Sequence, residues 1–594
     1  MNEENPYDGL PNLLDLAAAV GNISAQAHEM LNAAIGEEES ANAQTADPLG
    51  LIPAFRALAA SLAQHPERIV EAQFEAFQAY MQIWQQAASQ WIGLDTSDDA
   101  TSGAGDRRFK SDDWEANPFF SFMRGVYLVS AKSMFGLVHN AEDIDEKTKA
   151  KVEFYVKQYI DALSPTNFAL TNPEVLRETV GTGGKNLLQG LKNYLADIDP
   201  ETGSLKTRMV DKSAFELGRN VATTAGKVVF QNELMQLIQY EPLSESVCKR
   251  PLLIIPPWIN KFYILDLQEK NSFIRNVVSE GHTVFVISWV NPDASLAHKD
   301  FVDYMLEGPV AALDAIEQAT GESSVNVIGY CLGGTLLGAT LAYLQASGDN
   351  RIASATFFTA MLDFSEPGDL GVFIDETQLD SIERMMENQG YLDGKEMATT
   401  FNMLRANDLI WSFFINNYLM GKEPLAFDLL FWNSDSTRMP ARMHSTYLRK
   451  MYLENRLKEP GGIELNGVPI DLSTVDLPII FISALEDHIA PWRSTFEGAK
   501  LFRGDVTFVL SQAGHIAGIV NPPGKRQYGH FTGPAPHGLD AEQWLNSAER
   551  SEASWWGLWG EWVAKHGGDK VPARFPGDGE LPVIEDAPGS YVKA

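Results

Sequence analysis

The chain has 594 residues, 45% of them hydrophobic, and a formal net charge of −33. This length exceeds what one hydrophobic core usually holds, so we expect more than one domain. The acidic charge argues against nucleic acid as a partner, because phosphate backbones are bound through clusters of Lys and Arg. No apolar run reaches the roughly 18 residues of a membrane-spanning helix. Two cysteines and an acidic N-terminus, where a signal peptide needs positive charge, predict a cytoplasmic protein.

One helix is predicted within the first hundred residues, beginning at Pro66 and Glu67. Its large apolar residues recur at alternating spacings of four and three, which places them on one stripe: Val70, Phe74, Phe77, Met81, Trp84, Ala88 and Trp91. Such a stripe should be covered, either by the chain's own domain or by a partner. The polar, Gly-rich segment at about 94–106 is predicted to be a linker, and the pattern from 107 to about 210 is mostly helical. We therefore assign residues 1–212 to a mainly helical domain.

From residue 213 onward, strand-like runs alternate with helical patterns, which predicts a mostly parallel sheet. The expected strands are 252–255, 283–288, 325–328, 355–359, 479–483 and 506–510. An aromatic and Met-rich insertion at about 363–476 interrupts them and is expected to form a lid. Four tryptophans, Trp555, Trp556, Trp559 and Trp562, predict a buried amphipathic helix. The Pro-, Gly- and acid-rich chain after Val571 is expected to be loosely held.

The most informative motif is a strand, a sharp turn and the start of a helix around Cys331. Gly329, Gly333 and Gly334 flank the cysteine, and small residues are needed where strand and helix approach closely. This pattern predicts a nucleophile elbow in which Cys replaces the usual Ser. The positive end of the helix dipole at that position favours the thiolate.

A base and an acid follow the elbow in the chain order typical of this fold. Asp487 comes directly after the predicted strand 479–483, and His515 lies in the loop after 506–510. We predict that Asp487 is the acid and His515 the base. His488 is either a pocket residue or a structural histidine, and Glu486 is expected to be a solvated loop charge. Cys248 is expected to be a bystander.

The elbow, together with the segments 487–492 and 514–523, resembles the bacterial poly(3-hydroxyalkanoate) synthases, and most closely the single-subunit class I type. Further matching motifs are 106–109, 164–168, 215–220, 256–266 and 431–435, so the resemblance extends from about residue 106 to the end. It implies an α/β-hydrolase-type core at 213–594 with a lid at about 363–476, behind the helical domain.

The resemblance also implies a function. The enzyme would polymerise (R)-3-hydroxyacyl-CoA, such as 3-hydroxybutyryl-CoA, through an acyl thioester on Cys331 and release CoA. The backbone N–H groups of Leu332 and Ile264 would hold the oxyanion. When a second hydroxyacyl unit attacks, Asp487 would either orient His515 or assist the hydroxyl directly. Arg405 and Asn455 match positions near the CoA path. No cofactor or metal is expected, because CoA is part of the substrate and also a product.

Several alternatives and partners remain open. The same elbow would serve an intracellular polyester depolymerase or an acyl-CoA thioesterase, whereas a catalytically idle granule coat would not need the complete set of Cys, Asp and His. The resemblance implies a homodimer associated with cytoplasmic polyester granules, and the stripe on the first helix is then a candidate to bind a granule-coating protein or the polymer. CoA is polyanionic, but the acidic excess is partly segregated, since residues 1–100 contain fifteen acidic residues and two arginines.

Overall fold

The computed structural model describes residues 47, 49–91, 106–201, 203–524 and 527–594. The chain forms two compact units, and the first combines the described residues up to Met209 with Arg405–Pro424. The second comprises Val210–Leu404 and Leu425–Ala594. Most of the predicted linker at 94–106 lies outside the described residues, as does the acidic N-terminus. In the described part of the chain, no helix combines the length and apolarity required to cross a bilayer.

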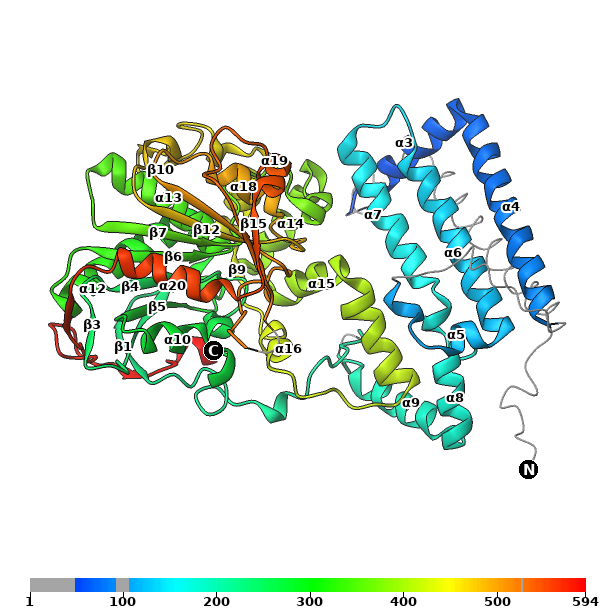
Figure 1. Cartoon of the computed structure of the whole chain (residues 1–594), viewed down its shortest axis with the longest axis horizontal. Helices are drawn as coiled ribbons and strands as arrows, with labels where there is room; N and C mark the ends of the chain where they lie inside the picture. The colour runs from blue at the N-terminus through cyan, green and yellow to red at the C-terminus, as the bar shows by residue number, and fades with distance from the viewer. Residues whose placement is uncertain (1–46, 48, 92–105, 202, 525–526) are drawn as a thin grey trace. The chain divides into compact units, whose positions relative to one another are not determined.

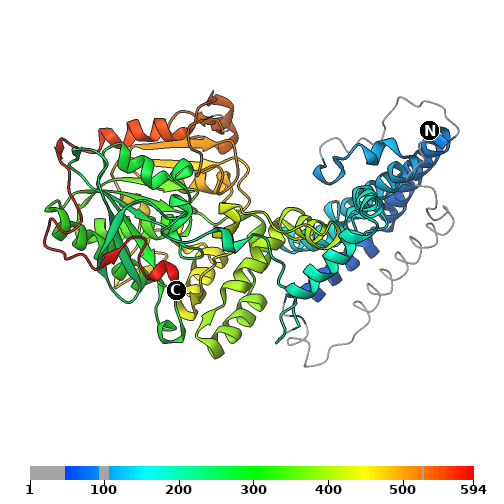
Figure 2. The same cartoon turned by 90° about the horizontal axis from the view of Figure 1, so that it is seen from below.

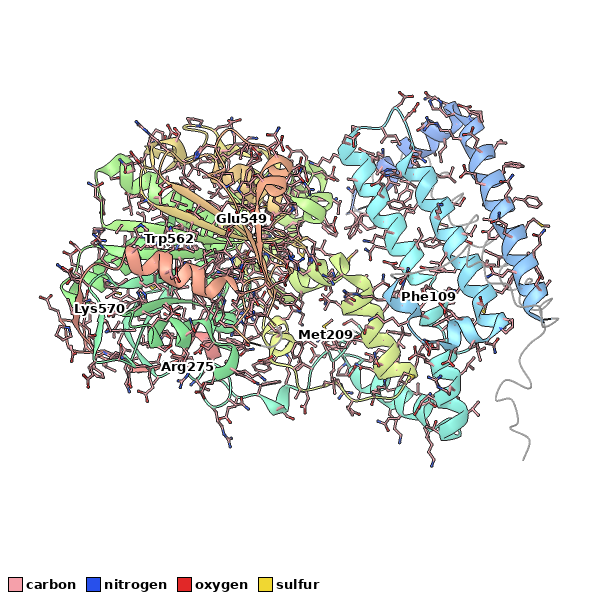
Figure 3. The ribbon with its side chains drawn as sticks, viewed as in Figure 1. Phe109, Met209, Arg275, Glu549, Trp562 and Lys570 are labelled. Atoms are coloured by element: carbon pink, nitrogen blue, oxygen red, sulfur yellow. The ribbon has the colours of Figure 1, made fainter. Side chains whose placement is uncertain are left out.

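The first unit is helical, as predicted, and its long helices lie side by side (Figures 1 and 2). Its helices are α3 (Leu51–Gln64), α4 (Pro66–Trp91), α5 (Asp113–Ala116), α6 (Pro118–His139), α7 (Glu146–Ala162), α8 (Pro173–Thr182) and α9 (Lys185–Asp197). Their core includes Phe109, labelled in Figure 3, together with Trp114 and Phe120. Two π-helical turns, η9 (Asn407–Trp411) and η10 (Phe414–Leu419), complete the unit.

Helix α9 packs against η10 through polar side chains. Asn186 donates a hydrogen bond to the carbonyl oxygen of Leu419 (2.9 Å), and Asn193 donates to that of Asn417 (3.1 Å). Gly190 allows the close approach, because a Cβ atom there would lie 1.8 Å from the carbonyl oxygen of Tyr418. The segment 405–424 is therefore bound into the helical unit although it belongs to the predicted lid.

The second unit is built on an eleven-stranded sheet of described residues, with the order β15-β14-β13-β12-β7-β6-β4-β5-β2-β1-β17. Six central strands run parallel: β5 (Val284–Trp289), β4 (Leu252–Ile255), β6 (Val325–Tyr330), β7 (Ile352–Phe358), β12 (Ile479–Ala484) and β13 (Val506–Ser511). These are the predicted strands. Antiparallel strands extend both edges: β1 (Gly226–Gln231), β2 (Met235–Tyr240), β14 (His530–Thr532), β15 (Glu549–Ser551) and β17 (Glu585–Asp586).

Successive side chains of a strand point to opposite faces of the sheet, and the central strands are buried along their whole length. Both faces of the sheet are therefore apolar. Ile254, Ile328 and Ile482 point to the face covered by α10 (Phe273–Ser279) and α20 (Trp555–Lys565). Figure 1 shows both helices on one side of the sheet. The opposite face packs against other helices: α11 (Phe301–Met305), α12 (Ala311–Thr320), α13 (Leu332–Ser347), α18 (Trp492–Ala499) and α19 (Ala541–Ser547).

The insertion after β7 contributes short elements to the second unit. They are α14 (Glu376–Gln389), α15 (Gly394–Leu404), α16 (Asp428–Asn433), α17 (Ala441–Tyr447), the π-turn η11 (Leu448–Leu453), the pair β8 (Tyr391–Leu392) and β9 (Met439–Pro440), and the hairpin β10 (Glu464–Leu465) and β11 (Val468–Pro469).

The helix α20 carries the four predicted tryptophans and is buried as predicted, with Trp555, Trp556 and Trp559 at most 3% exposed. Trp562, labelled in Figure 3, lies on the same helix and packs at the edge of this core.

The expectation of a loosely held chain after Val571 is wrong. This segment forms β16 (Lys570–Pro572), which pairs with β3 (Ser246–Cys248), and then β17, which pairs with β1. Val592 near the end is 1% exposed. Composition alone indicated a mobile tail, but partners distant in the sequence hold it in place.

Candidate active site

Cys331 lies at the turn between β6 and α13 in a strained backbone conformation (φ 51°, ψ −122°). The flanking glycines are required by close contacts. A Cβ atom on Gly329 would lie 2.6 Å from the Cα atom of Gly334, and one on Gly333 would lie 2.2 Å from the carbonyl oxygen of Ile255. The Cys331 N–H donates to the carbonyl oxygen of Phe358 (2.8 Å), which ties the turn to β7. The turn therefore has the geometry of a nucleophile elbow.

Asp487 and His515 come together from the loops after β12 and β13. His515 Nδ1 lies 2.7 Å from Asp487 Oδ2. The other carboxylate oxygen, Oδ1, accepts hydrogen bonds from the N–H groups of Ile489 (2.8 Å) and Ala490 (2.9 Å). Because the Asp487 side chain is fully buried, these three bonds fix the carboxylate and the imidazole ring that it holds.

The electrostatics of the site connect His515 to Cys331. Burial disfavours the imidazolium, but the negative charges of Asp487 and Cys331 and the hydrogen bonds to both outweigh it, so the pKa of His515 is raised well above its usual value. The ring of Tyr330 stacks on His515, with centroids 5.8 Å apart. The structure therefore brings His515 into contact with Asp487 and into the electrostatic field of Cys331.

Two tyrosines beside Cys331 were not predicted from the sequence. Tyr447 and Tyr452 are hydrogen-bonded to each other, and their rings lie 5.5 Å apart. Burial raises the pKa of both hydroxyls, and the charge of the Cys331 sulfur adds to the shift. Phe364 packs against both rings. The three rings therefore form an aromatic wall, and its two tyrosines lie within the electrostatic field of Cys331.

The π-turn η11 explains why this pair is hard to find in the sequence. With about 3.6 residues per turn, an α-helix places residues five apart on different faces, whereas a π-turn aligns them. Tyr447 and Tyr452 are five residues apart: Tyr447 directly precedes the turn, and Tyr452 lies within it. The available sequence signal was only an aromatic-rich insertion.

The two predicted oxyanion donors lie in different surroundings. Leu332 is the first residue of α13, so its N–H has no acceptor within the helix. Ile264 is fully buried in the 3₁₀ helix η4 (Phe262–Asp266), which follows β4 and a loop. The loop after β4 is where this fold supplies its second donor.

Asn455 and Arg405, the two residues expected near the CoA path, each have local partners. Asn455 accepts a hydrogen bond from the Phe364 N–H (2.8 Å) and donates to Asp363 (2.8 Å), so it braces the turn after β7. Arg405 belongs to the helical unit and pairs with Asp408.

Three further side chains surround or compete with the predicted site. His488 is half-buried and Glu486 is exposed, each on the loop that carries Asp487. Cys248 is buried on β3 and accepts a hydrogen bond from Lys570 (3.3 Å). Among the residues that the structure describes, no cluster of three or more His, Cys, Asp and Glu side chains is arranged to hold a metal ion.

The fold and the elbow define an α/β-hydrolase-type enzyme. Residues 250–522 match the family described as alpha/beta hydrolase fold, and residues 105–277 match "Poly-beta-hydroxybutyrate polymerase (PhaC) N-terminus". The chain is 51% identical to the poly(3-hydroxyalkanoate) polymerase subunit PhaC of Rhizobium meliloti, over 89% of this chain and 86% of that one.

Two more relatives carry similar names. The identity is 49% to the poly(3-hydroxyalkanoate) polymerase of Methylorubrum extorquens, over 89% of this chain and 87% of that one. It is 41% to the poly(3-hydroxyalkanoate) polymerase subunit PhaC of Cupriavidus necator, over 91% of each. The chain therefore belongs to the poly(3-hydroxyalkanoate) polymerase family, in its class I type, and is an enzyme of the acyltransferase class.

Proposed function

We propose that this enzyme polymerises (R)-3-hydroxyacyl-CoA, with short chains such as 3-hydroxybutyryl-CoA preferred, through an acyl thioester on Cys331. The observation that carries the proposal is the buried hydrogen bond between Asp487 and His515, together with a cysteine on a nucleophile elbow whose charge raises the pKa of His515. A thioester on cysteine keeps the transfer potential of the incoming CoA thioester, which a polymerase needs for the next transfer.

The first half-reaction forms the acyl enzyme. His515 takes the proton of the Cys331 thiol, and the thiolate attacks the thioester carbonyl carbon. The N–H groups of Leu332 and Ile264 stabilise the oxyanion. When the carbon–sulfur bond to CoA breaks, CoA leaves as a thiol with the proton from His515. No cofactor enters this step.

In the second half-reaction a 3-hydroxyl group attacks the Cys331 thioester. His515 removes the hydroxyl proton, a new ester bond forms, and the Cys331 thiol is regenerated. Asp487 acts through His515 in this scheme, because both of its oxygens already accept hydrogen bonds inside a fully buried side chain. The wall of Phe364, Tyr447 and Tyr452 would exclude water, the competing nucleophile.

We also propose a cytoplasmic homodimer that attaches to its polyester granule. The support is the large apolar side chains exposed on α4: Val70, Phe74, Phe77, Met81 and Trp84. Exposed apolar patches mark association surfaces.

The test of the proposed reaction is incubation of the purified enzyme with 3-hydroxybutyryl-CoA. We expect insoluble polyester and one CoA released per monomer added, with little free 3-hydroxybutyrate. Free acid as the main product would instead identify a thioesterase, and lack of CoA release together with degradation of added polyester would identify a depolymerase.

A further inference from the structure

The loop that leads from β4 to Ile264 contains a buried lysine. Lys261 is 7% exposed, and its ammonium group donates hydrogen bonds to the carbonyl oxygen of Val592 (2.9 Å) and to a main-chain oxygen of Ala594 (2.7 Å). Asp435 lies 3.5 Å from the same nitrogen. A buried ammonium is costly unless it is fully hydrogen-bonded, so the segment around Val592 fixes where Lys261 can lie.

The backbone and neighbours of Lys261 are held equally firmly. The indole N–H of Trp432 donates to the Lys261 carbonyl oxygen (2.6 Å), and the Tyr263 hydroxyl donates to Asp435 (2.8 Å). At the far end of η4, the buried carboxyl group of Asp266 accepts from the hydroxyls of Thr224 (2.6 Å) and Ser272 (2.6 Å). Ile264 therefore lies between Lys261 and Asp266, two buried ionisable residues that are each hydrogen-bonded to their own partners.

The segment that Lys261 binds is itself anchored to the sheet. The Tyr591 hydroxyl donates to the Asn232 carbonyl oxygen (2.7 Å), and the Tyr591 N–H donates to the side-chain oxygen of Gln236 (3.1 Å). Val592 is buried in the same core as Ile264. Residues 591–594 thus connect the start of β2 to the loop before Ile264.

We infer that Lys261 is a positioning residue for the oxyanion donor, and that residues 591–594 act on the reaction by holding Lys261. This inference rests on the proposed function, in which the Ile264 N–H binds the developing oxyanion. Such a donor must keep its position within a fraction of an ångström, because a misplacement of about 1 Å costs on the order of 100-fold in rate.

The test compares two reactions of the same sulfur. Acylation by 3-hydroxybutyryl-CoA develops an oxyanion, whereas alkylation of Cys331 by iodoacetamide does not. In Lys261→Met we expect the first-turnover rate of CoA release to fall about 10- to 100-fold, with little change in KM. The alkylation rate should stay within about twofold of the wild type, since the bridge from Asp487 through His515 is untouched. An unchanged acylation rate, or equal losses in both reactions, would overturn the inference.

Two further variants keep the result interpretable. Removal of residues 592–594 should reproduce the selective loss, and it replaces Lys261→Met if that variant does not fold. Lys299→Met is the matched control, because Lys299 is also a buried lysine but pairs with Glu233 and Glu307. It should leave both rates unchanged. If alkylated wild-type enzyme still released CoA, the proposed function itself would be wrong, and this outcome is separate from a failure of the Lys261 variants.

Discussion

The active-site edge of the sheet and the outer face of α4 differ in which side chains they bury and which they expose. At the sheet edge, polar groups are buried and hydrogen-bonded: Asp487 is fully buried, and each of its oxygens has a partner. On α4, five large apolar side chains are between 42% and 65% exposed, whereas Ile83 and Ala87 on the same helix are buried. The first arrangement suits chemistry on a small molecule, and the second suits association with a larger apolar partner.

The same comparison corrects a simple interpretation of helical periodicity. The stripe of Val70, Phe74, Phe77 and Met81 and the tryptophans of α20 have similar apolar spacing, but only α20 is covered by described residues. Ala88 of the stripe is also exposed, and the side chain of Trp91 lies outside the described residues. Periodicity therefore identifies a helix and its apolar face, but it does not identify what that face contacts.

The largest expected effect is at the sheet edge. Cys331→Ala should abolish CoA release and polymer formation while leaving the unfolding temperature unchanged, because only the nucleophile is lost. Cys331→Ser should keep little activity, since an alkoxide is much harder to form than a thiolate. CoA release with a thiol reagent and thermal unfolding measure the two properties. More than trace turnover by Cys331→Ala would remove this residue from the mechanism.

Asp487→Asn should slow both acylation and chain transfer by about 10³- to 10⁴-fold, because the amide no longer holds His515 in the required tautomer. The Asp487 carboxylate raises the pKa of His515, so the variant should lose the His515 proton at a lower pH. Because His515 accepts protons in its neutral form, the acid limb of the rate profile should lie at a lower pH than in the wild type. Rapid-quench mass spectrometry of Cys331 across pH measures this. Normal acylation with only chain transfer blocked would instead mean that Asp487 acts directly on the hydroxyl.

A stability comparison separates the covered helix from the exposed one. Trp559 is fully buried, and its indole N–H donates to Thr356 (3.1 Å), so Trp559→Ala should cost about 3–5 kcal/mol. Phe77→Ala on α4 should change the free energy of unfolding by less than about 0.5 kcal/mol. Denaturant unfolding of the two variants decides the point. A large loss for Phe77→Ala would show that the α4 face is covered within the folded chain.

The smallest effect on chemistry is expected on α4. Combined replacement of Phe74, Phe77 and Trp84 by Ser should leave the first-turnover rate of CoA release within about twofold of the wild type. We expect a longer lag, a smaller dimer fraction or weaker sedimentation with polyester particles, because the apolar association surface is lost. Wild-type behaviour in all three assays would exclude a role in association.

The central fold and the turn that carries Cys331 could be predicted because their signals are local. The strand β4 is a continuous apolar run, β6 and β12 are mostly apolar, and the elbow needs glycines next to Cys331. The pairing of Tyr447 with Tyr452 could not be predicted, because it depends on a π-turn that the residue pattern does not indicate. The anchoring of residues 591–594 depends on Lys261, which lies more than three hundred positions earlier in the chain. The composition of the C-terminal segment does not indicate this contact.

The membership of residues 405–424 in the helical unit gives the enzyme a discontinuous architecture. The polypeptide passes between the two units at three places, near residues 209, 404 and 424, so a single cut at the first of them does not separate the units. A shortened chain beginning at Val210 would keep η10 but lose Asn186 and Asn193, the hydrogen-bond donors to its carbonyl oxygens. Such a catalytic fragment would contain residues 405–424 without the helices of the unit to which they belong. A cleaner excision would replace residues 405–424 with a short loop as well.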